Sequence, residues 1–129
     1  MTTVLIVDDQ LELRSIHGAA LQSHGYSVLT AADGPRALAS ARAAHPDIIV
    51  LDHSLPGLTG VEVATELRDD PRTADIPIIM LTAHAYGAVG RKARAAGCVA
   101  FLAKPCTPRR LLTEIERHGG TAGVPTAAI

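Results

Sequence analysis

The sequence has little net charge and no long apolar run, and each absence excludes a class of proteins. Its formal net charge is only −1, so composition predicts no strong attraction to nucleic acid or to an anionic membrane surface. No apolar run approaches the roughly 18 residues that indicate a membrane span. We therefore expect a soluble protein that neither inserts into a membrane nor binds nucleic acid directly.

Cysteine is also scarce, with Cys98 and Cys106 the only two. The start of the chain has no basic segment, apolar stretch and small-residue cleavage site of the kind that directs secretion. Both features favour a reducing, cytoplasmic location, and we interpret the two cysteines as structural.

The length and apolar content suit one compact domain. A chain of 129 residues with 47% hydrophobic residues can build a single core without metals or disulfides. Residues 119–129 are small and mixed with Pro, which is typical of a flexible tail. The domain is therefore expected to span residues 1–118.

Five short apolar runs alternate with stretches of helical periodicity. Nearly continuous runs of Val, Ile, Leu and Met indicate strands buried on both faces of a parallel sheet. Five alternating strands and helices predict an α/β protein, with a parallel sheet between helices and right-handed crossovers. The runs are Val4–Val7, Ser27–Ala31, Ile48–Leu51, Ile78–Leu81 and Val99–Leu102.

Capping residues and glycines mark the ends of the predicted helices. Each helix is expected to turn apolar residues spaced by three or four positions toward the sheet. The first four of these sets are Leu13, Ile16, Ala20 and Leu21; Ala37, Leu38 and Ala41; Val61, Ala64 and Leu67; and the Ala-rich Arg91–Ala96. The fifth set is Leu111, Leu112 and Ile115. The predicted caps are Asp33, Thr59 with Glu62, and Thr107 before Pro108, and the predicted stops are Gly25 and Gly97.

Polar residues follow four of the five predicted strands. In open α/β sheets, ligands bind beyond the carboxyl ends of the strands. Any one of these residues alone is best explained as a turn or cap, but five at one edge indicate a site. They are Asp8 and Asp9, Asp52, Thr82 and Lys104.

The chemistry of this group favours phosphoryl transfer. Three clustered carboxylates repel one another, so at least one should have a raised pKa unless a cation binds. Oxygen ligands suit Mg²⁺ better than Zn²⁺, which prefers nitrogen and sulfur, and such an ion neutralises a transferring phosphoryl group. Asp52 is the natural nucleophile because carboxylates form acyl phosphates. Thr82 can donate a hydrogen bond to the phosphoryl group, and Lys104 can supply positive charge.

Taken in order, these residues resemble the receiver domains of bacterial two-component response regulators. The resemblance covers about residues 3 to 118 and rests on VDD at 7–9, LDHSLPGLTG at 51–60, LTA at 81–83 and KP at 104–105. It implies a doubly wound, flavodoxin-like (βα)5 sandwich of three layers with strand order 2-1-3-4-5. It also implies a single-domain regulator of the chemotaxis, relay or cell-cycle type.

The resemblance implies a role for each site residue. Asp52 would be the phosphoacceptor, and Mg²⁺, for which Mn²⁺ could substitute, would be held by three carboxylates and a backbone carbonyl. The implied metal ligands are Asp8, Asp9, Asp52 and the carbonyl of Ser54. The implied phosphoryl-binding and switch residues are Thr82, Lys104 and Phe101; Pro105 would follow a cis peptide bond, and Ser54 and His84 would tune the lifetime of the phosphorylated form.

Partners follow from the same resemblance. The donor would be a phosphohistidine on a sensor kinase or phosphotransfer protein, and the chain would be no enzyme beyond assisting its own phosphorylation and dephosphorylation. A downstream protein would meet the fourth and fifth helices and the last strand, with the chain a monomer or weak dimer. The basic residues of those helices are candidates for this contact: Arg91, Lys92, Arg94, Arg109 and Arg110.

Alternatives remain open at this point. The chain could be a receiver fragment of a larger regulator or hybrid kinase. A Mg²⁺-dependent phosphohydrolase that forms an aspartyl phosphate is disfavoured, because it needs an acid/base group two residues after the nucleophile, where Ser54 stands. A passive interaction module would lack the acceptor, a metal ligand or the lysine. A metal or phosphoacceptor role for His53 and His84 is also disfavoured, since His53 should point away from Asp52.

Overall fold

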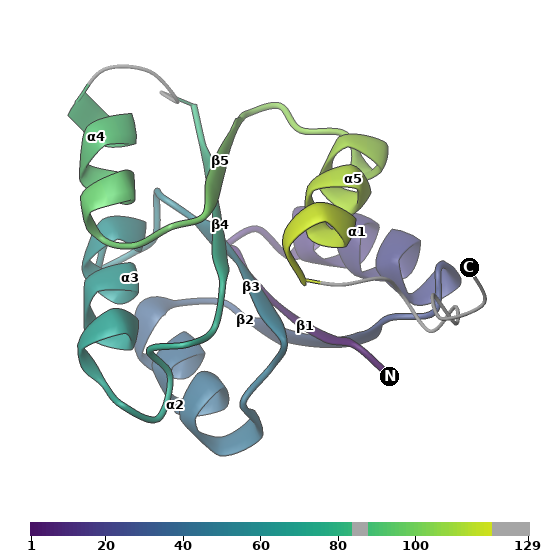
Figure 1. The fold of residues 1–129 in the computed structure, drawn as a ribbon. Coiled ribbons are helices and arrows are strands. Elements are labelled where there is room, and N and C mark those ends of the chain that lie inside the picture. The colour runs from purple at the N-terminus through teal and green to yellow at the C-terminus, as the bar shows by residue number, and fades with distance from the viewer. Residues whose placement is uncertain (84–87, 120–129) are drawn as a thin grey trace.

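The computed structural model describes residues 1–83 and 88–119 and forms a three-layer α/β sandwich (Figure 1). Strands and helices alternate along the whole described chain, as the sequence predicted. The strands are β1 (Thr3–Val7), β2 (Ser27–Ala31), β3 (Ile48–Asp52), β4 (Ile78–Thr82) and β5 (Ala100–Ala103). The helices are α1 (Leu11–Ser23), α2 (Gly34–Ala44), α3 (Gly60–Asp69), α4 (Ala88–Ala95) and α5 (Pro108–Gly119).

All five strands are parallel and lie in the order β2-β1-β3-β4-β5. This order confirms the doubly wound fold. The register places Val7 beside Leu51 and Thr82 beside Ala103, so strands β1, β3, β4 and β5 end at one edge of the sheet. The residues that follow these strand ends are therefore brought together by the topology.

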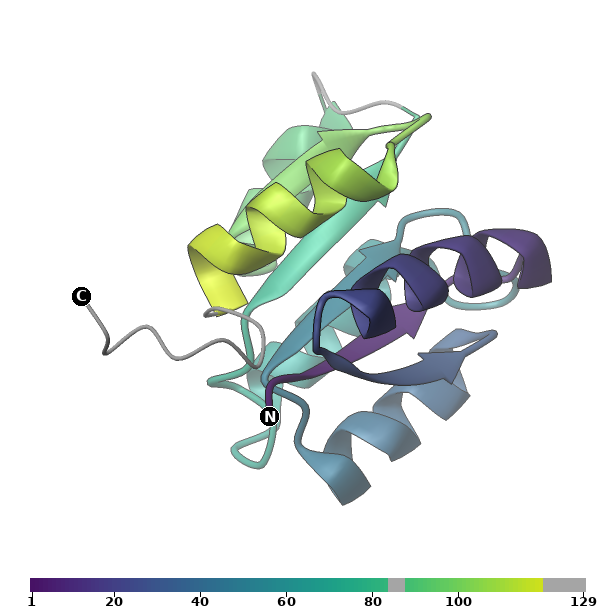
Figure 2. The same ribbon diagram turned by 90° about the vertical axis from the view of Figure 1, so that its right-hand side faces the viewer.

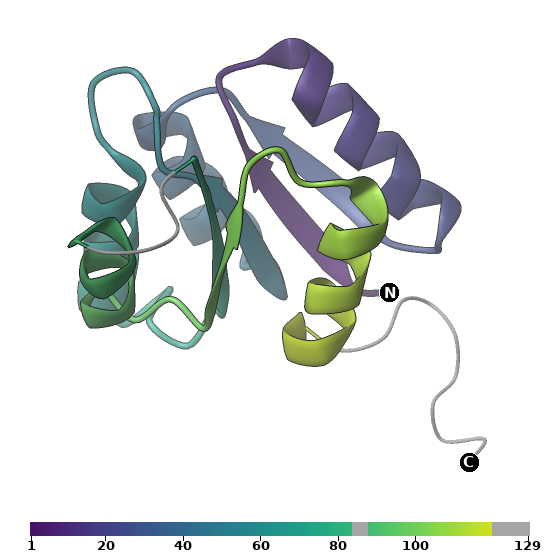
Figure 3. The ribbon, with the colours of Figure 1, turned by 90° about the horizontal axis from the view of Figure 1, so that it is seen from above.

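Helices cover both faces of the sheet. Helices α1 and α5 lie on one face, and α2, α3 and α4 lie on the other (Figures 1 and 2). Each face has its own apolar cluster: Leu21 and Leu111 belong to the α1 and α5 side, and Leu38 and Val63 to the opposite side. The view from above shows the same three layers (Figure 3). The sheet is thus held rigidly from both sides, which gives the strand ends fixed positions.

Local signals set the helix ends where the sequence predicted them. The side chains of Asp33, Thr59 and Thr107 each accept a hydrogen bond from a backbone N–H in the first turn, which satisfies donors that have no partner within the helix. Gly25 and Gly97 adopt φ values of 90° and 93°, a conformation that ends a helix at little cost only for glycine.

Two sequence predictions about side-chain placement are wrong. Val99 lies outside β5 and is 44% exposed, and Ile16 on α1 is 54% exposed. On α1 the buried positions are instead His17, Gly18 and Leu21. Gly18 faces β2, and an added Cβ would make an ordinary contact with a methyl of Val28 at 3.6 Å. The side of α1 that faces the sheet therefore carries His17, Gly18 and Leu21 rather than Ile16.

The last helix ends at Gly119, one residue beyond the predicted domain boundary. Residues 120–129 lie outside the described residues, so the flexible tail stays a prediction. Within residues 1–83 and 88–119, no helix has the length and apolar character needed to cross a membrane.

Candidate functional site

Three carboxylates meet where β1 and β3 end. Asp8 and Asp9 follow β1, and Asp52 is the last residue of β3. One carboxylate oxygen from each lies within 4.8 Å of the others. Asp8 and Asp52 are each only 2% exposed, whereas Asp9 is open to solvent. Two buried acids and one exposed acid therefore form a group that could hold a cation and that is open to solvent at Asp9.

Lys104 brings a positive charge to these acids. Its Nζ lies 2.8 Å from Oδ2 of Asp52 and 3.8 Å from Oδ2 of Asp8. Its backbone N–H donates a hydrogen bond of 2.8 Å to the carbonyl of Thr82, and its peptide bond to Pro105 is cis. Lys104 is thus anchored to β4 by its backbone while its side chain reaches across to β3 and β1.

Asp8 is less acidic than a solvated aspartate. Burial raises the pKa of its carboxyl group most, and the negative charges of Asp52 and Asp9 raise it further. The backbone N–H of Gln10 and the charge of Lys104 act in the opposite direction. The sequence predicted a raised pKa from repulsion among the acids, whereas desolvation is the larger cause. A bound cation would relieve both effects.

Asp52 is held against the start of α3. Its Oδ1 accepts a hydrogen bond of 3.2 Å from the backbone N–H of Ser54. At the first residue of α3, the N–H of Gly60 donates a hydrogen bond of 2.8 Å to the carbonyl of His53, the residue after Asp52. A Cβ at position 60 would lie 2.6 Å from the carbonyl oxygen of Asp52 and 2.8 Å from Cα of His53. Glycine is therefore required here for α3 to approach the strand that carries Asp52.

Replacing Gly60 with alanine should lower the free energy of unfolding by about 2 kcal/mol, because the added methyl group would meet backbone atoms that cannot move aside. Urea denaturation measures this change. Gly18→Ala is the matched control, since its Cβ would make an ordinary contact at 3.6 Å and alanine favours helix. Equal stability of the two variants would contradict this account of Gly60.

Thr82 and Phe101 occupy the neighbouring strands. Thr82 ends β4 and is 2% exposed, and Asp52 pairs in register with Leu81, the residue before it. Phe101 on β5 is half-buried and packs against the apolar cluster on the α4 side. The guanidinium carbon of Arg94 lies 4.9 Å from the centre of the Phe101 ring. This cation–π contact favours the present orientation of the ring.

Other conspicuous residues stay apart from the acidic group or lie outside the described residues. His53 is half-buried beside Asp52, and the metal-competent group among residues 1–83 and 88–119 contains no histidine. His84 lies outside the described residues. Burial raises the pKa of the Cys98 thiol to about 11 and also raises that of Cys106. Both thiols therefore stay protonated at neutral pH, which agrees with a structural role.

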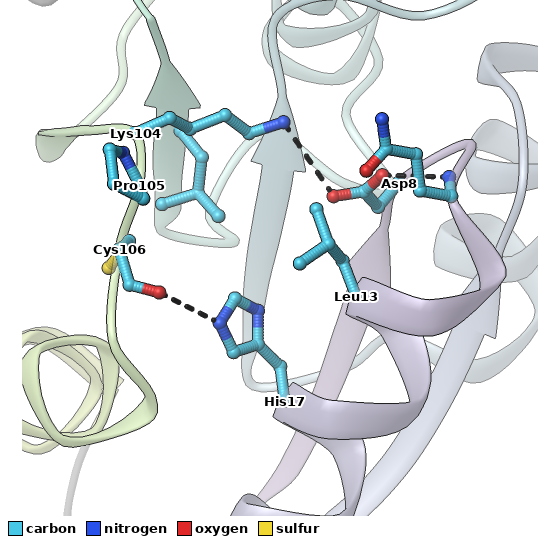
Figure 4. Close-up of a pocket in the computed structure, with 8 residues that line it drawn as sticks. Asp8, Leu13, His17, Lys104, Pro105 and Cys106 are labelled. Carbon is cyan, nitrogen blue, oxygen red and sulfur yellow. Dashed lines mark hydrogen bonds and ion pairs between the residues drawn. The ribbon is translucent and has the colours of Figure 1, made fainter.

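Three residues at the site were not predicted from the sequence. Gln10 donates its backbone N–H to Oδ1 of Asp8 at 2.9 Å, and the Arg14 guanidinium donates to the Asp8 carbonyl at 2.6 Å. His17 lines a cavity of about 340 Å³ beside the acids (Figure 4). The one available signal for His17 was its position next to the apolar positions of the helix, which predicts that it faces the sheet. A search for apolar residues at helical spacing passes over it because histidine is polar.

The sequence matches the response regulator receiver domain family over residues 4–116. The chain belongs to this family. It is therefore a receiver domain of two-component signalling, and receiver domains are signalling switches. The resemblance read from VDD, LDHSLPGLTG, LTA and KP is thereby confirmed, as is the fold that it implies.

Two curated relatives are similar to this chain over most of its length. The polar-differentiation response regulator DivK of Brucella ovis is 33% identical over 120 residues, covering 93% of this chain and 98% of DivK. The phosphate regulon transcriptional regulatory protein PhoB of Pseudomonas aeruginosa is 39% identical over 114 residues, covering 88% of this chain. This chain spans half of the length of PhoB.

One similar solved structure is the receiver domain of the sensor histidine kinase PA1611 from Pseudomonas aeruginosa. It superposes with a TM-score of 0.84 at 33% identity, covering 93% of this chain and 98% of that one. A magnesium ion is coordinated in its active site cleft.

Proposed function

We propose that Asp52 accepts a phosphoryl group from a phosphohistidine and that the change of state alters the affinity of this receiver domain for a partner protein. One observation carries the proposal: Asp52 lies in a group of three carboxylates within 4.8 Å, with the ammonium of Lys104 at 2.8 Å. Charge of both signs at one buried carboxylate is what a phosphoryl acceptor requires.

The carboxylates fit a divalent cation. They offer hard oxygen ligands, and the exposed Asp9 leaves room for water, which suits Mg²⁺. The ion in the cleft of the PA1611 receiver domain supports the same choice. Asp8, Asp9 and Asp52, with the carbonyl of Ser54, would hold Mg²⁺, and Mn²⁺ could replace it. When bound, the ion would neutralise charge on the acids and on the phosphoryl oxygens.

The protein side chains divide the remaining work. An oxygen of Asp52 attacks phosphorus, the new O–P bond forms, and the P–N bond of phosphohistidine breaks with its electron pair left on the imidazole. Lys104 stabilises negative charge on the transferring group, and Thr82 donates a hydrogen bond to it. Beyond this assistance to its own phosphorylation and dephosphorylation, we propose no enzymatic activity. Ser54 and His84 remain proposed determinants of the phosphoryl lifetime.

The proposed switch links the site to the opposite end of β5. When Thr82 moves toward the phosphoryl group, space opens behind it and Phe101 can turn inward. Arg94, stacked on the ring at 4.9 Å, would have to release Phe101 in this movement. The phosphoryl group therefore acts by preferring one of two existing states.

The proposed output face lies on α4, β5 and α5. A groove of about 490 Å³ there contains Phe101 and the exposed Arg94. Its base is ordered by the buried Glu114, whose Oε1 accepts from Arg110 at 2.8 Å and from Arg117 at 3.1 Å. The face is predominantly basic and borders the switch residue, so it suits a protein partner that responds to phosphorylation. We expect the domain to act in the cytoplasm, as a monomer or weak dimer, without direct nucleic acid binding.

Incubation with Mg²⁺ and acetyl phosphate, followed by intact mass measurement, tests the proposed function. We expect a stable gain of one phosphoryl group that requires the divalent cation. Rapid turnover of many phosphate esters without a stable gain would instead indicate a hydrolase. No gain at all would indicate a passive interaction module, and either result would overturn the proposal.

A further inference from the structure

His17 is a buried polar side chain on α1 that the proposed chemistry does not use. It is 4% exposed, and its Nε2 lies 3.2 Å from the carbonyl oxygen of Cys106. Because a carbonyl oxygen can only accept, Nε2 carries the proton and donates this hydrogen bond. The bond joins residues 89 positions apart, so it ties α1 to the loop between β5 and α5.

This loop carries Lys104 and has few backbone hydrogen bonds of its own. Pro105 has no N–H to donate. On one side of it, the N–H of Lys104 bonds to the carbonyl of Thr82. On the other side, the carbonyl of Cys106 bonds to His17. Besides the ion pairs of the Lys104 side chain, the backbone of the segment from 104 to 106 is thus held at one point on β4 and at one on α1.

A cavity beside Lys104 explains why the hydrogen bond from His17 to the Cys106 carbonyl matters. About 340 Å³ of space separates α1 from the lysine and the proline, and it is bounded by Leu13 and Leu81 as well as by His17 (Figure 4). The Lys104 side chain crosses the upper part of this space to reach Asp8. Direct packing is therefore incomplete on this side of Lys104, and the hydrogen bond from His17 spans the gap.

The helix that supplies the donor is itself well fixed. Leu21, one turn after His17, is 1% exposed in the core. Gly18 is buried on the side of α1 that faces Val28 of β2, and the Arg14 guanidinium donates a hydrogen bond to the carbonyl of Asp8. Because α1 is packed against the sheet, the N–H of His17 can hold the loop between β5 and α5 in one position.

We propose that His17 is a positioning residue: by holding the Cys106 carbonyl against α1, it keeps Nζ of Lys104 in place for phosphoryl transfer to Asp52. This inference rests on the proposed function. It predicts that loss of the His17 donor slows the transfer step itself, because Lys104 acts on charge that develops during transfer.

The test compares His17→Gln with His17→Asn. Both variants carry a primary amide, but only glutamine places an N–H near the position of Nε2. Phosphorylation by acetyl phosphate at saturating Mg²⁺ is followed over a range of donor concentrations. We expect the maximal rate of His17→Gln to stay within about twofold of the original protein and that of His17→Asn to fall about tenfold, with little change in KM, as expected for a displaced catalytic group.

Two controls separate positioning from a general loss of structure. His24→Leu removes the exposed imidazole at the end of α1 that also contacts a carbonyl, that of Ala20 at 2.9 Å, and should leave the rate unchanged. Thermal unfolding of each variant selects an assay temperature at which all are folded. If His17→Asn does not fold, the comparison of His17→Gln with His17→Leu takes its place.

A double-mutant cycle identifies the residue through which His17 acts. In the background of Lys104→Met, His17→Asn should cause less than about a twofold further change, because the group that it positions is gone. An equal loss in both backgrounds, or equal rates for the glutamine and asparagine variants, would overturn the inference. These results differ from failure of the proposed function, in which the original protein itself gains no phosphoryl group.

Discussion

Asp52→Asn should gain no phosphoryl group under conditions in which the original protein is fully labelled. The amide nitrogen and oxygen of asparagine match the carboxylate in size but provide no anionic nucleophile, so the acyl phosphate cannot form. The fold should be retained, because Asp52 contributes to the sheet through its backbone and is followed by the capping box of α3, which does not involve its side chain. Intact mass measurement reports the label, and thermal unfolding reports the fold.

A second carboxylate variant serves as the control for Asp52. Asp69→Asn alters an exposed acid at the end of α3, and we expect it to be labelled as fully as the original protein. Peptide mapping should place the phosphoryl group on residue 52. A label that persists in Asp52→Asn, on His53 or any other residue, would contradict the assignment of the acceptor.

Lys104→Met should slow phosphorylation by about 10²-fold or more, because removing one preorganised donor to developing negative charge typically has an effect of this size. Methionine retains much of the apolar stem of lysine, so the change removes mainly the ammonium that lies 2.8 Å from Asp52. The loss should appear in the maximal rate rather than in the KM for acetyl phosphate. Because Lys104 lowers the pKa of Asp8, that pKa should rise further in the variant.

The control for Lys104 makes the same chemical change elsewhere. Lys92→Met removes an exposed ammonium from α4, and its phosphorylation rate should match that of the original protein. Comparable rates for Lys92→Met and Lys104→Met would show that overall charge, rather than the charge beside Asp52, governs the reaction. That result would remove Lys104 from the proposed site.

The order of secondary structure elements was predictable because the signals for it are local. Continuous apolar runs such as Ile48–Leu51 become strands only one residue longer than predicted. A capping box depends only on two residues three positions apart, each of which bonds through its side chain to the backbone of the other. Thr59 and Glu62 could therefore be recognised without tertiary information. The convergence of Asp8, Asp52 and Lys104 follows from parallel strands that end at one edge.

Predictions of burial were weaker where the partner of an element determined the outcome. On α1, Ile16 fits the apolar periodicity but is 54% exposed, and the buried positions are His17, Gly18 and Leu21. Val99 is a β-branched residue of the kind that strands favour, yet β5 begins only at Ala100. In both cases the burial of the side chain depends on packing against segments distant in the sequence, which apolar periodicity does not contain.

Residue order and spacing alone specified the α/β architecture, the family and the set of acids with their lysine, because periodicity, capping and strand ends act over a few residues. Tertiary structure was needed to bring His17 within 3.2 Å of Cys106, to place the Cβ-free Gly60 against the backbone of Asp52 and to stack Arg94 on Phe101. These contacts depend on how helices settle against the sheet, and that is determined by packing among residues far apart in the chain.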